Sequence, residues 1–216
     1  DKIIGNDGKV IATAEQIQHG QELYQSRGLQ QYGSVLGHGA YIGPDFTAEY
    51  LRLTTDAAVK QYREEGKQEP RELVKNEWRK ENKYDESSKT LNWTAGQTKG
   101  FDQMVNHYRD TLTKDNTSQG LFPNAIKSEE ELHDLVAFFG WTAWASAAER
   151  PNQDYTYTNN WPAEANVDNK PTADLMVWSA LSLIALVVGT GLMVAIYGRW
   201  SRTIGWHGEE APVLDF

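Results

Sequence analysis

The longest hydrophobic run in the chain extends from Leu175 to Gly198, over 24 residues without a charged side chain. A helix of this length spans about 36 Å, more than the roughly 30 Å hydrocarbon core of a bilayer. The alternative is a buried core helix, but the rest of the chain is too polar to surround it. The pattern therefore predicts one transmembrane helix, with Trp178, Tyr197 and Trp200 as interfacial aromatic residues.

Small residues recur within this predicted transmembrane helix. Ala185 and Gly189 are four positions apart, and Gly191 follows closely. Such spacing lets two helix backbones approach each other in lipid, where packing drives association. It predicts contact with another helix, either in the same membrane protein or in a homodimer through residues 175–198. The alternative is that these residues only line lipid.

Hydrophobic positions before this segment recur at helical spacing and predict a mainly α-helical domain over residues 1–149. The clearest helix follows Ser128 as N-cap, with Glu131 completing a capping box. Its stripe is most simply core packing and consists of Leu132, Leu135, Val136, Phe139 and Ala143. Earlier helices are predicted over residues 14–26, 48–65, 70–82 and 98–112.

Two polar segments separate these elements. Residues 83–96, "KYDESSKTLNWTAG", fit either two short strands or a loop. Residues 150–173 contain three prolines and five asparagines and predict an extended connector. The predicted organisation is thus a domain over 1–149, a connector over 150–173, a transmembrane helix over 174–200 and a final segment over 201–216.

Charge and composition exclude several classes of function. The net charge of −9 argues against nucleic acid as a partner, because nucleic-acid binding needs a basic face. The absence of cysteine excludes disulfides, thiolate metal sites and covalently attached haem.

The charges that flank the hydrophobic run predict its orientation. Arg199 and Arg202 follow it directly, whereas acidic residues predominate before it. The positive-inside rule therefore places the C-terminal side in the cytoplasm. Residues 1–173 would then lie outside, which in a bacterium is the periplasmic side of the inner membrane.

No catalytic constellation is visible. The histidines are scattered, and no two occupy the i, i+3 or i, i+4 positions of a helical metal pair; they are His19, His38, His107, His133 and His207. The glycine-rich stretch "GHGAYIGPD" at 37–45 lacks a phosphate-loop pattern. His38 within it is more typical of a loop or packing histidine than of a ligand.

The order of first helix, glycine-rich loop and last helix resembles the two ends of a small c-type cytochrome domain. "GHGAYIGPD" is similar to the "GEGAYxAPE" stretch of the cytochrome c subunit of bacterial nitric oxide reductase. In that register Leu29 and Tyr32 stand at the positions of the two haem-attachment cysteines, and Gly33 stands at the position of the proximal histidine. Phe122, before a proline, occupies the place of the axial methionine. The resemblance implies a cytochrome c fold without haem.

Such a fold would need its vacated pocket filled, because destabilisation rises by about 24 cal/mol per Å³ of void. We expect four large side chains to fill it, namely Tyr32, Phe122, Phe138 and Trp141. His38 stands at the position of the glutamate in the related loop, which implies a hydrogen-bonding role.

The stretches "FFGWTAWASAAERP" and "YTNNWP" extend the resemblance to quinol-dependent nitric oxide reductase, in which a haemless cytochrome c-like domain is fused to the catalytic subunit. This resemblance implies a role in denitrification: two NO are reduced to N2O and water with electrons from quinol. The family uses haem b, haem b3 and a non-haem iron in a transmembrane catalytic bundle. We expect none of these cofactors, and no catalytic residue, in this chain.

Under this resemblance the domain is a periplasmic cap and membrane anchor for the catalytic bundle, towards which residues 201–216 lead. In the two-subunit relatives, backbone carbonyls of the "GAY" stretch help to bind a calcium ion. Gly39 and Tyr41 match those positions, and carbonyl oxygens suit this hard cation.

Two alternatives belong to other functional classes. One is a stand-alone membrane-anchored scaffold or partner-binding protein with a degenerate cytochrome c fold. The other is an electron-transfer protein with non-covalently bound haem, against which the missing ligands argue.

Overall fold

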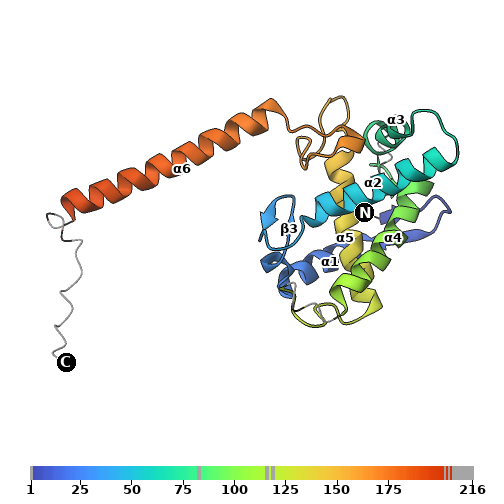
Figure 1. Cartoon of the computed structure of the whole chain (residues 1–216), viewed down its shortest axis with the longest axis horizontal. Coiled ribbons are helices and arrows are strands. Elements are labelled where there is room, and N and C mark those ends of the chain that lie inside the picture. The colour runs from blue at the N-terminus through green and yellow to red at the C-terminus, as the bar shows by residue number, and fades with distance from the viewer. Residues whose placement is uncertain are drawn as a thin grey trace. The chain divides into compact units, whose positions relative to one another are not determined.

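The computed structural model describes residues 2–81, 84–114, 117, 120–201, 203 and 205 of the 216-residue chain. These residues divide into two compact units, Asp1–Thr172 and Ala173–Phe216. Unit 1 is mainly helical, and unit 2 contains a single long helix (Figure 1). The predicted fold class, a mainly α-helical domain followed by one apolar helix, is confirmed.

The described residues of unit 1 form five α-helices, which are α1 (Ala14–Ser26), α2 (Phe46–Glu64), α3 (Pro70–Lys75), α4 (Ala95–Leu112) and α5 (Glu129–Ala147). A π-helical segment, η2 (Asn76–Lys80), continues α3, and two short 3-10 turns are η1 (Leu29–Gln31) and η4 (Ala165–Val167). A capping box begins α1, because Thr13 and Gln16 exchange side-chain and backbone hydrogen bonds.

Capping residues explain why two helices begin earlier than predicted. Asp45 is the N-cap of α2 and accepts a hydrogen bond from the Ala48 backbone N–H over 2.9 Å. Thr47, the residue before the predicted start, lies within α2 and shares a buried hydrogen bond with Thr142 of α5. Helix α4 starts at Ala95 because Thr94 caps it. Local cap chemistry therefore sets both boundaries.

The N-cap of α5 differs in part from the predicted capping box. Ser128 caps the helix as expected, with its hydroxyl accepting from the Glu131 backbone N–H over 3.1 Å. The Glu131 carboxylate instead accepts from the Lys127 backbone N–H and from the Arg27 guanidinium of α1. The side chain that was expected to close the cap therefore joins α5 to α1.

A small sheet lies beside the helices in the order β2-β1-β6-β5. Its strands are β1 (Lys2–Ile4), β2 (Val10–Thr13), β5 (Tyr84–Asp85) and β6 (Thr90–Asn92). β1 pairs with β2 antiparallel and with β6 parallel. The two-strand alternative for residues 83–96 is thus the observed one. A separate hairpin joins β3 (Ser34–Val35) to β4 (His38–Gly39).

The core of unit 1 lies where α5 packs against α1, α2 and α4. Helix α1 crosses α5 so closely that a Cβ on Gly20 would lie 2.0 Å from the Asp134 carbonyl oxygen. At the centre, the rings of Phe46 and Phe139 stack in parallel, with their centroids 4.5 Å apart. Stacked and edge-on aromatic pairs of this kind dominate the apolar burial.

Unit 2 contains α6 (Ala173–Trp200), whose length and hydropathy suffice to cross a membrane. Its side chains show no burial within the structure. The helix begins one residue before the predicted start and ends at the predicted residue. Most of the predicted final segment, 201–216, including His207, lies outside the described residues.

Candidate functional site

Three of the four positions that the resemblance assigns to haem attachment and ligation lie in the interior of unit 1. Leu29 is 1% exposed in η1, and Tyr32, directly after η1, is 8% exposed. Gly33 packs tightly, because a Cβ there would lie 2.5 Å from the Pro44 carbonyl oxygen and 2.7 Å from the Phe46 ring. A histidine at position 33 would therefore need this loop to move away from α2.

Phe122 does not lie in the interior, where it was expected to fill space. Its side chain is 61% exposed, and its ring lies over the backbone of Gly28. The prediction that Phe122 fills the vacated pocket is therefore wrong. Of the other three expected residues, Tyr32 and Phe138 are buried and Trp141 is half-buried. Phe46, which was not among the expected residues, contacts Tyr32 and stacks on Phe139 in the aromatic core.

The space that remains between these positions themselves is too small for haem. The hollow between Leu29, Tyr32 and Phe122 has a volume of about 110 Å³. Small-molecule sites usually measure about 300–1,000 Å³. A larger hollow of about 520 Å³ adjoins Phe138 and His38, but its polar lining is mainly glutamine. Without cysteine anywhere in the chain, no residue can supply a thioether to the group.

Buried polar groups hold the glycine-rich loop in shape. Asp45 accepts hydrogen bonds from the Gly37 backbone N–H over 2.6 Å and from the Ser34 hydroxyl over 2.8 Å. The Tyr24 hydroxyl donates to the carbonyls of Gly33 and His38. Burial raises the pKa of Tyr24 to about 12.

The proposed calcium ligands lie on this loop. Gly39 belongs to β4, and the Tyr41 side chain is 85% exposed with its hydroxyl donating to the Gly37 carbonyl. His38 bonds through Nδ1 to the Leu36 carbonyl over 3.1 Å. Among the described residues, no group of three or more His, Cys, Asp or Glu side chains could hold a metal ion. A calcium site formed by backbone carbonyls remains a prediction.

Two histidines that looked unrelated in the sequence meet at one buried carboxylate. His19 Nδ1 lies 2.8 Å from Asp134 Oδ2, and His133 Nδ1 lies 3.4 Å from Asp134 Oδ1. Gln16 also donates to Asp134 Oδ1 over 3.1 Å. The hydrogen bond with Asp134 raises the pKa of His19. Sequence spacing missed this cluster because His19 and Asp134 meet only when α1 packs on α5.

A second such contact joins α2 to α4. His107 Nε2 lies 3.6 Å from Glu49 Oε1, and the buried Tyr108 hydroxyl donates to Glu49 Oε2 over 2.9 Å. Glu49 raises the pKa of His107, and burial raises that of Tyr108 well above its ordinary value. Both histidine contacts tie together helices of the core.

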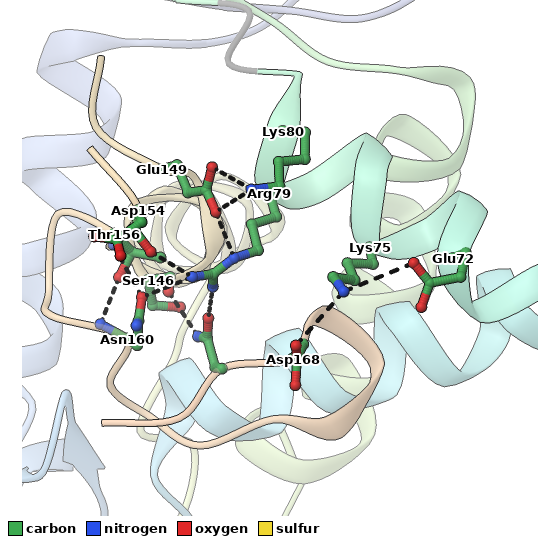
Figure 2. Close-up of polar contacts among 11 residues, drawn as sticks. Glu72, Lys75, Arg79, Lys80, Ser146, Glu149, Asp154, Thr156, Asn160 and Asp168 are labelled. Carbon is green, nitrogen blue, oxygen red and sulfur yellow. Dashed lines mark hydrogen bonds and ion pairs between the residues drawn. The ribbon is translucent and has the colours of Figure 1, made fainter. Parts of the chain in front are cut away.

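Arg79 of η2 is a buried charge with several hydrogen-bond partners, and it is 6% exposed (Figure 2). Its Nε donates to Glu149 Oε1 and its Nη1 to Asn169 Oδ1, each over 2.7 Å. Its Nη2 donates to Asn160 Oδ1 and to the Asp154 carbonyl, each over 3.1 Å. One guanidinium thus donates hydrogen bonds to four residues of the segment 149–169.

The segment 150–172 is therefore fixed to unit 1 although it contains little regular structure. The Asn169 amide donates to the carbonyls of Ser146 and Pro162. Asn166 donates to Thr55 and Asp56 of α2. Three of the five asparagines that suggested an extended connector are thus buried hydrogen-bonding groups, namely Asn160, Asn166 and Asn169.

Comparison with known proteins identifies one family. The family described as the NorB cytochrome c-like domain of nitric oxide reductase matches residues 1–163. A search of curated protein sequences finds no match to the chain.

Proposed function

The chain belongs to the NorB family of nitric oxide reductases through its cytochrome c-like domain, and on this premise we propose that it is the haem-free N-terminal part of a quinol-dependent enzyme. Membership of the family implies an oxidoreductase role in nitric oxide reduction within a larger membrane enzyme. The quinol dependence and the structural role of the domain are the proposal.

The proposed reaction is the reduction of two NO by one quinol. The quinol gives up two electrons and two protons and becomes quinone. These convert two NO to one N2O and one water, so that atoms and electrons balance. Haem b, haem b3 and non-haem iron would serve this chemistry in the catalytic bundle, and none of the residues described above takes part in it.

The observation that carries the proposal is the close packing at the former haem-attachment positions. Leu29 and Tyr32 are buried among core side chains, and Gly33 touches Pro44 and Phe46. A domain of this kind has no residues to attach a haem that would relay electrons from a soluble cytochrome. A quinol, which diffuses within the membrane, does not need such a relay.

We assign unit 1 the role of a periplasmic cap on the catalytic bundle, and α6 the role of its anchor in the bacterial inner membrane. The Arg79 network supports this role, since it holds the segment that precedes α6 against the domain. The flanking Arg199 supports the orientation with the C-terminal side in the cytoplasm. Functionally, residues 1–149 then form the cap and 150–173 its fixed connection to the anchor.

The proposal is tested in membranes that contain the complete enzyme. NO consumption should proceed with a soluble quinol analogue and not with reduced cytochrome c. Equal turnover with reduced cytochrome c would contradict quinol dependence. Deletion of residues 1–172 with α6 retained should abolish turnover, whereas full activity of that variant would contradict the cap role. A chain that accumulates alone in the membrane, without a catalytic bundle, would favour the scaffold alternative.

A further inference from the structure

A hollow of about 520 Å³ opens between α1, the turn η1 and the β3–β4 hairpin, and Phe138 of α5 also lines it. Sites for small molecules usually measure about 300–1,000 Å³. Among the described residues that line the hollow, none is Asp, Glu, Lys or Arg, although 24% of the chain is charged. The hollow is therefore large enough for a small molecule and presents it with no charged side chain.

Four exposed glutamines line this hollow and are here called the amide cluster, namely Gln21 and Gln25 of α1 and Gln30 and Gln31 of η1. Gln21 and Gln25 lie four residues apart and therefore share one face of α1. No hydrogen bond among the described residues engages the side-chain amides of the cluster. Each of these amides offers two N–H donors and a carbonyl acceptor to a ligand.

The other two glutamines of α1 differ from the amide cluster. The Gln16 side chain donates to Asp134 over 3.1 Å, and the Gln18 side chain donates to Glu22 over 3.2 Å. Neither of them lines the hollow. The same helix thus places its engaged amides away from the hollow and its unengaged amides on it.

His38 adds an acceptor to the lining. Its Nδ1 lies 3.1 Å from the Leu36 carbonyl oxygen. Because a carbonyl oxygen can only accept, Nδ1 carries the hydrogen, and Nε2 of the neutral ring is left as an acceptor. Donors and acceptors from amides, and one acceptor from an imidazole, therefore surround the hollow.

The hollow also has a fixed apolar part. Val35 and Phe138 line it, and they are only 9% and 8% exposed because the rest of each side chain lies in the core. The Tyr24 hydroxyl donates to the carbonyls of Gly33 and His38 and so joins α1 to the hairpin. A site with walls fixed in this way loses little conformational freedom when a ligand binds.

This lining selects among classes of ligand. A charged ligand would lose its hydration without meeting an opposite charge. A wholly apolar ligand would cover the amide cluster and leave its donors and acceptors without partners. Hydroxyl and amide groups each combine a donor with an acceptor, so a neutral ligand that carries both groups and a small apolar part meets neither cost.

We propose that the hollow binds a neutral saccharide that carries N-acetyl groups. Its hydroxyls and its amide match the amide cluster and Nε2 of His38, and the methyl of the acetyl group matches Val35 and Phe138. The inference rests neither on the quinol dependence nor on the cap role.

The test uses the 216-residue chain in a detergent without a sugar headgroup, because an alkyl glycoside would compete for the hollow. The probe is N,N′-diacetylchitobiose, and cellobiose is the matched probe with the same linkage and no acetyl groups. Saturation-transfer NMR reports contact of the acetyl methyl with the protein, and a titration gives Kd. We expect diacetylchitobiose to bind at least about tenfold more tightly than cellobiose.

The amide cluster is tested with the double variant Gln25→Met, Gln30→Met, which keeps the length of both side chains and removes their hydrogen bonds. It should weaken binding at least about tenfold. Gln18→Met, on the same helix but outside the hollow, is the control and should leave Kd unchanged. No binding of diacetylchitobiose, equal binding of cellobiose, or an unchanged Kd in the double variant would each overturn the proposal.

Two further arms decide between occupants. Binding of N-acetyl-trialanine amide in place of the saccharide would assign the hollow to peptides and overturn the proposal. Once diacetylchitobiose binds, co-sedimentation of the complete enzyme with purified cell-wall sacculi identifies a glycan strand as the source, and its absence identifies a free saccharide; both results keep the proposal.

The same titration on the complete enzyme shows whether the hollow is a site there. A Kd within about threefold of that of the chain supports the proposal, whereas loss of binding would overturn it. Turnover after deletion of residues 1–172 bears on the cap role alone, so the two proposals can fail separately.

Discussion

The guanidinium of Arg79 donates a hydrogen bond from Nε to the carboxylate of Glu149 over 2.7 Å, and both side chains are largely buried, at 7% and 13% exposure. Their backbones are also joined, since the Glu149 N–H donates to the Arg79 carbonyl over 3.0 Å. This pair marks the point at which α5 ends and the chain turns into the segment that leads to α6.

Removing one partner of a buried ion pair is costly, because it leaves polar groups and a charge without compensation. We expect Arg79→Ala to lower the free energy of unfolding by about 3–5 kcal/mol. Lys80→Met is the matched control, since Lys80 also binds Glu149 but is 53% exposed. It should cost at most about 1 kcal/mol. Denaturant titration of the chain in detergent measures both, and equal losses would show that Arg79 is no special anchor.

The two phenylalanines Phe46 and Phe122 should respond in opposite ways to truncation. Phe46 is fully buried and stacks on Phe139, so Phe46→Ala should cost about 3–5 kcal/mol of stability. Phe122 is 61% exposed, and Phe122→Ala should change stability by no more than about 0.5 kcal/mol. Thermal or denaturant unfolding distinguishes them. A large loss from Phe122→Ala would restore the view that Phe122 fills the core.

Protonation of His19 should stabilise the packing of α1 on α5. Because Asp134 raises the pKa of His19, the stabilisation is complete below the ordinary histidine pKa of about 6.5 and is lost as pH rises through the higher folded value. Glu49 acts in the same direction on His107. The free energy of unfolding should therefore fall as pH rises above the ordinary histidine pKa of about 6.5.

His19→Gln should flatten this pH dependence, and the double variant with His107→Gln should flatten it further. Gln18→Ala, at an exposed position of the same helix, is the control and should keep the slope of the parent chain. Unfolding measured across this pH range gives the slopes. Stability that rises with pH in the parent chain and not in His19→Gln would show the opposite linkage.

The small residues of α6 lead us to predict that this helix contacts another helix in the membrane. A Cβ on Gly189 would meet nothing within 4 Å in the described structure, so this position is open to a neighbouring helix. Gly189→Leu should weaken contact with that helix without preventing membrane insertion. Val187→Leu is the control on another side of the helix. Size analysis in detergent measures the oligomeric state of the complete enzyme, and an assay of NO consumption measures its turnover. If Gly189→Leu changes neither quantity, Gly189 faces only lipid.

Helices with local signals could be predicted well from the sequence. Helix α1 is specified by its capping box at Thr13 and ends before Gly28, and α5 follows Ser128. The strand β1 could not be found in this way. It is three residues long, and its parallel partner β6 pairs Lys2 with Thr90, a contact that only the complete fold creates.

The candidate site shows the same limit. A resemblance located Leu29, Tyr32 and Phe122 by position, but burial depends on which side chains the fold places around them. Phe122 is 61% exposed beside Gly28, whereas Phe46 stacks on Phe139 in the interior. Arg79 lies in the charged stretch "NEWRKEN", which is typical of a solvated helix face, and it becomes buried only because residues 149–169 fold over it.

The central claim is that unit 1 is a cytochrome c-like domain that binds no haem, and haem analysis tests it most directly. The 216-residue chain would be produced in the periplasm of a bacterium with an active haem-maturation system, purified in detergent, and examined by absorption spectroscopy and intact mass. We expect no Soret band and a mass equal to that of the polypeptide. A Soret band with stoichiometric haem, whether covalent or released by denaturation, would contradict the claim.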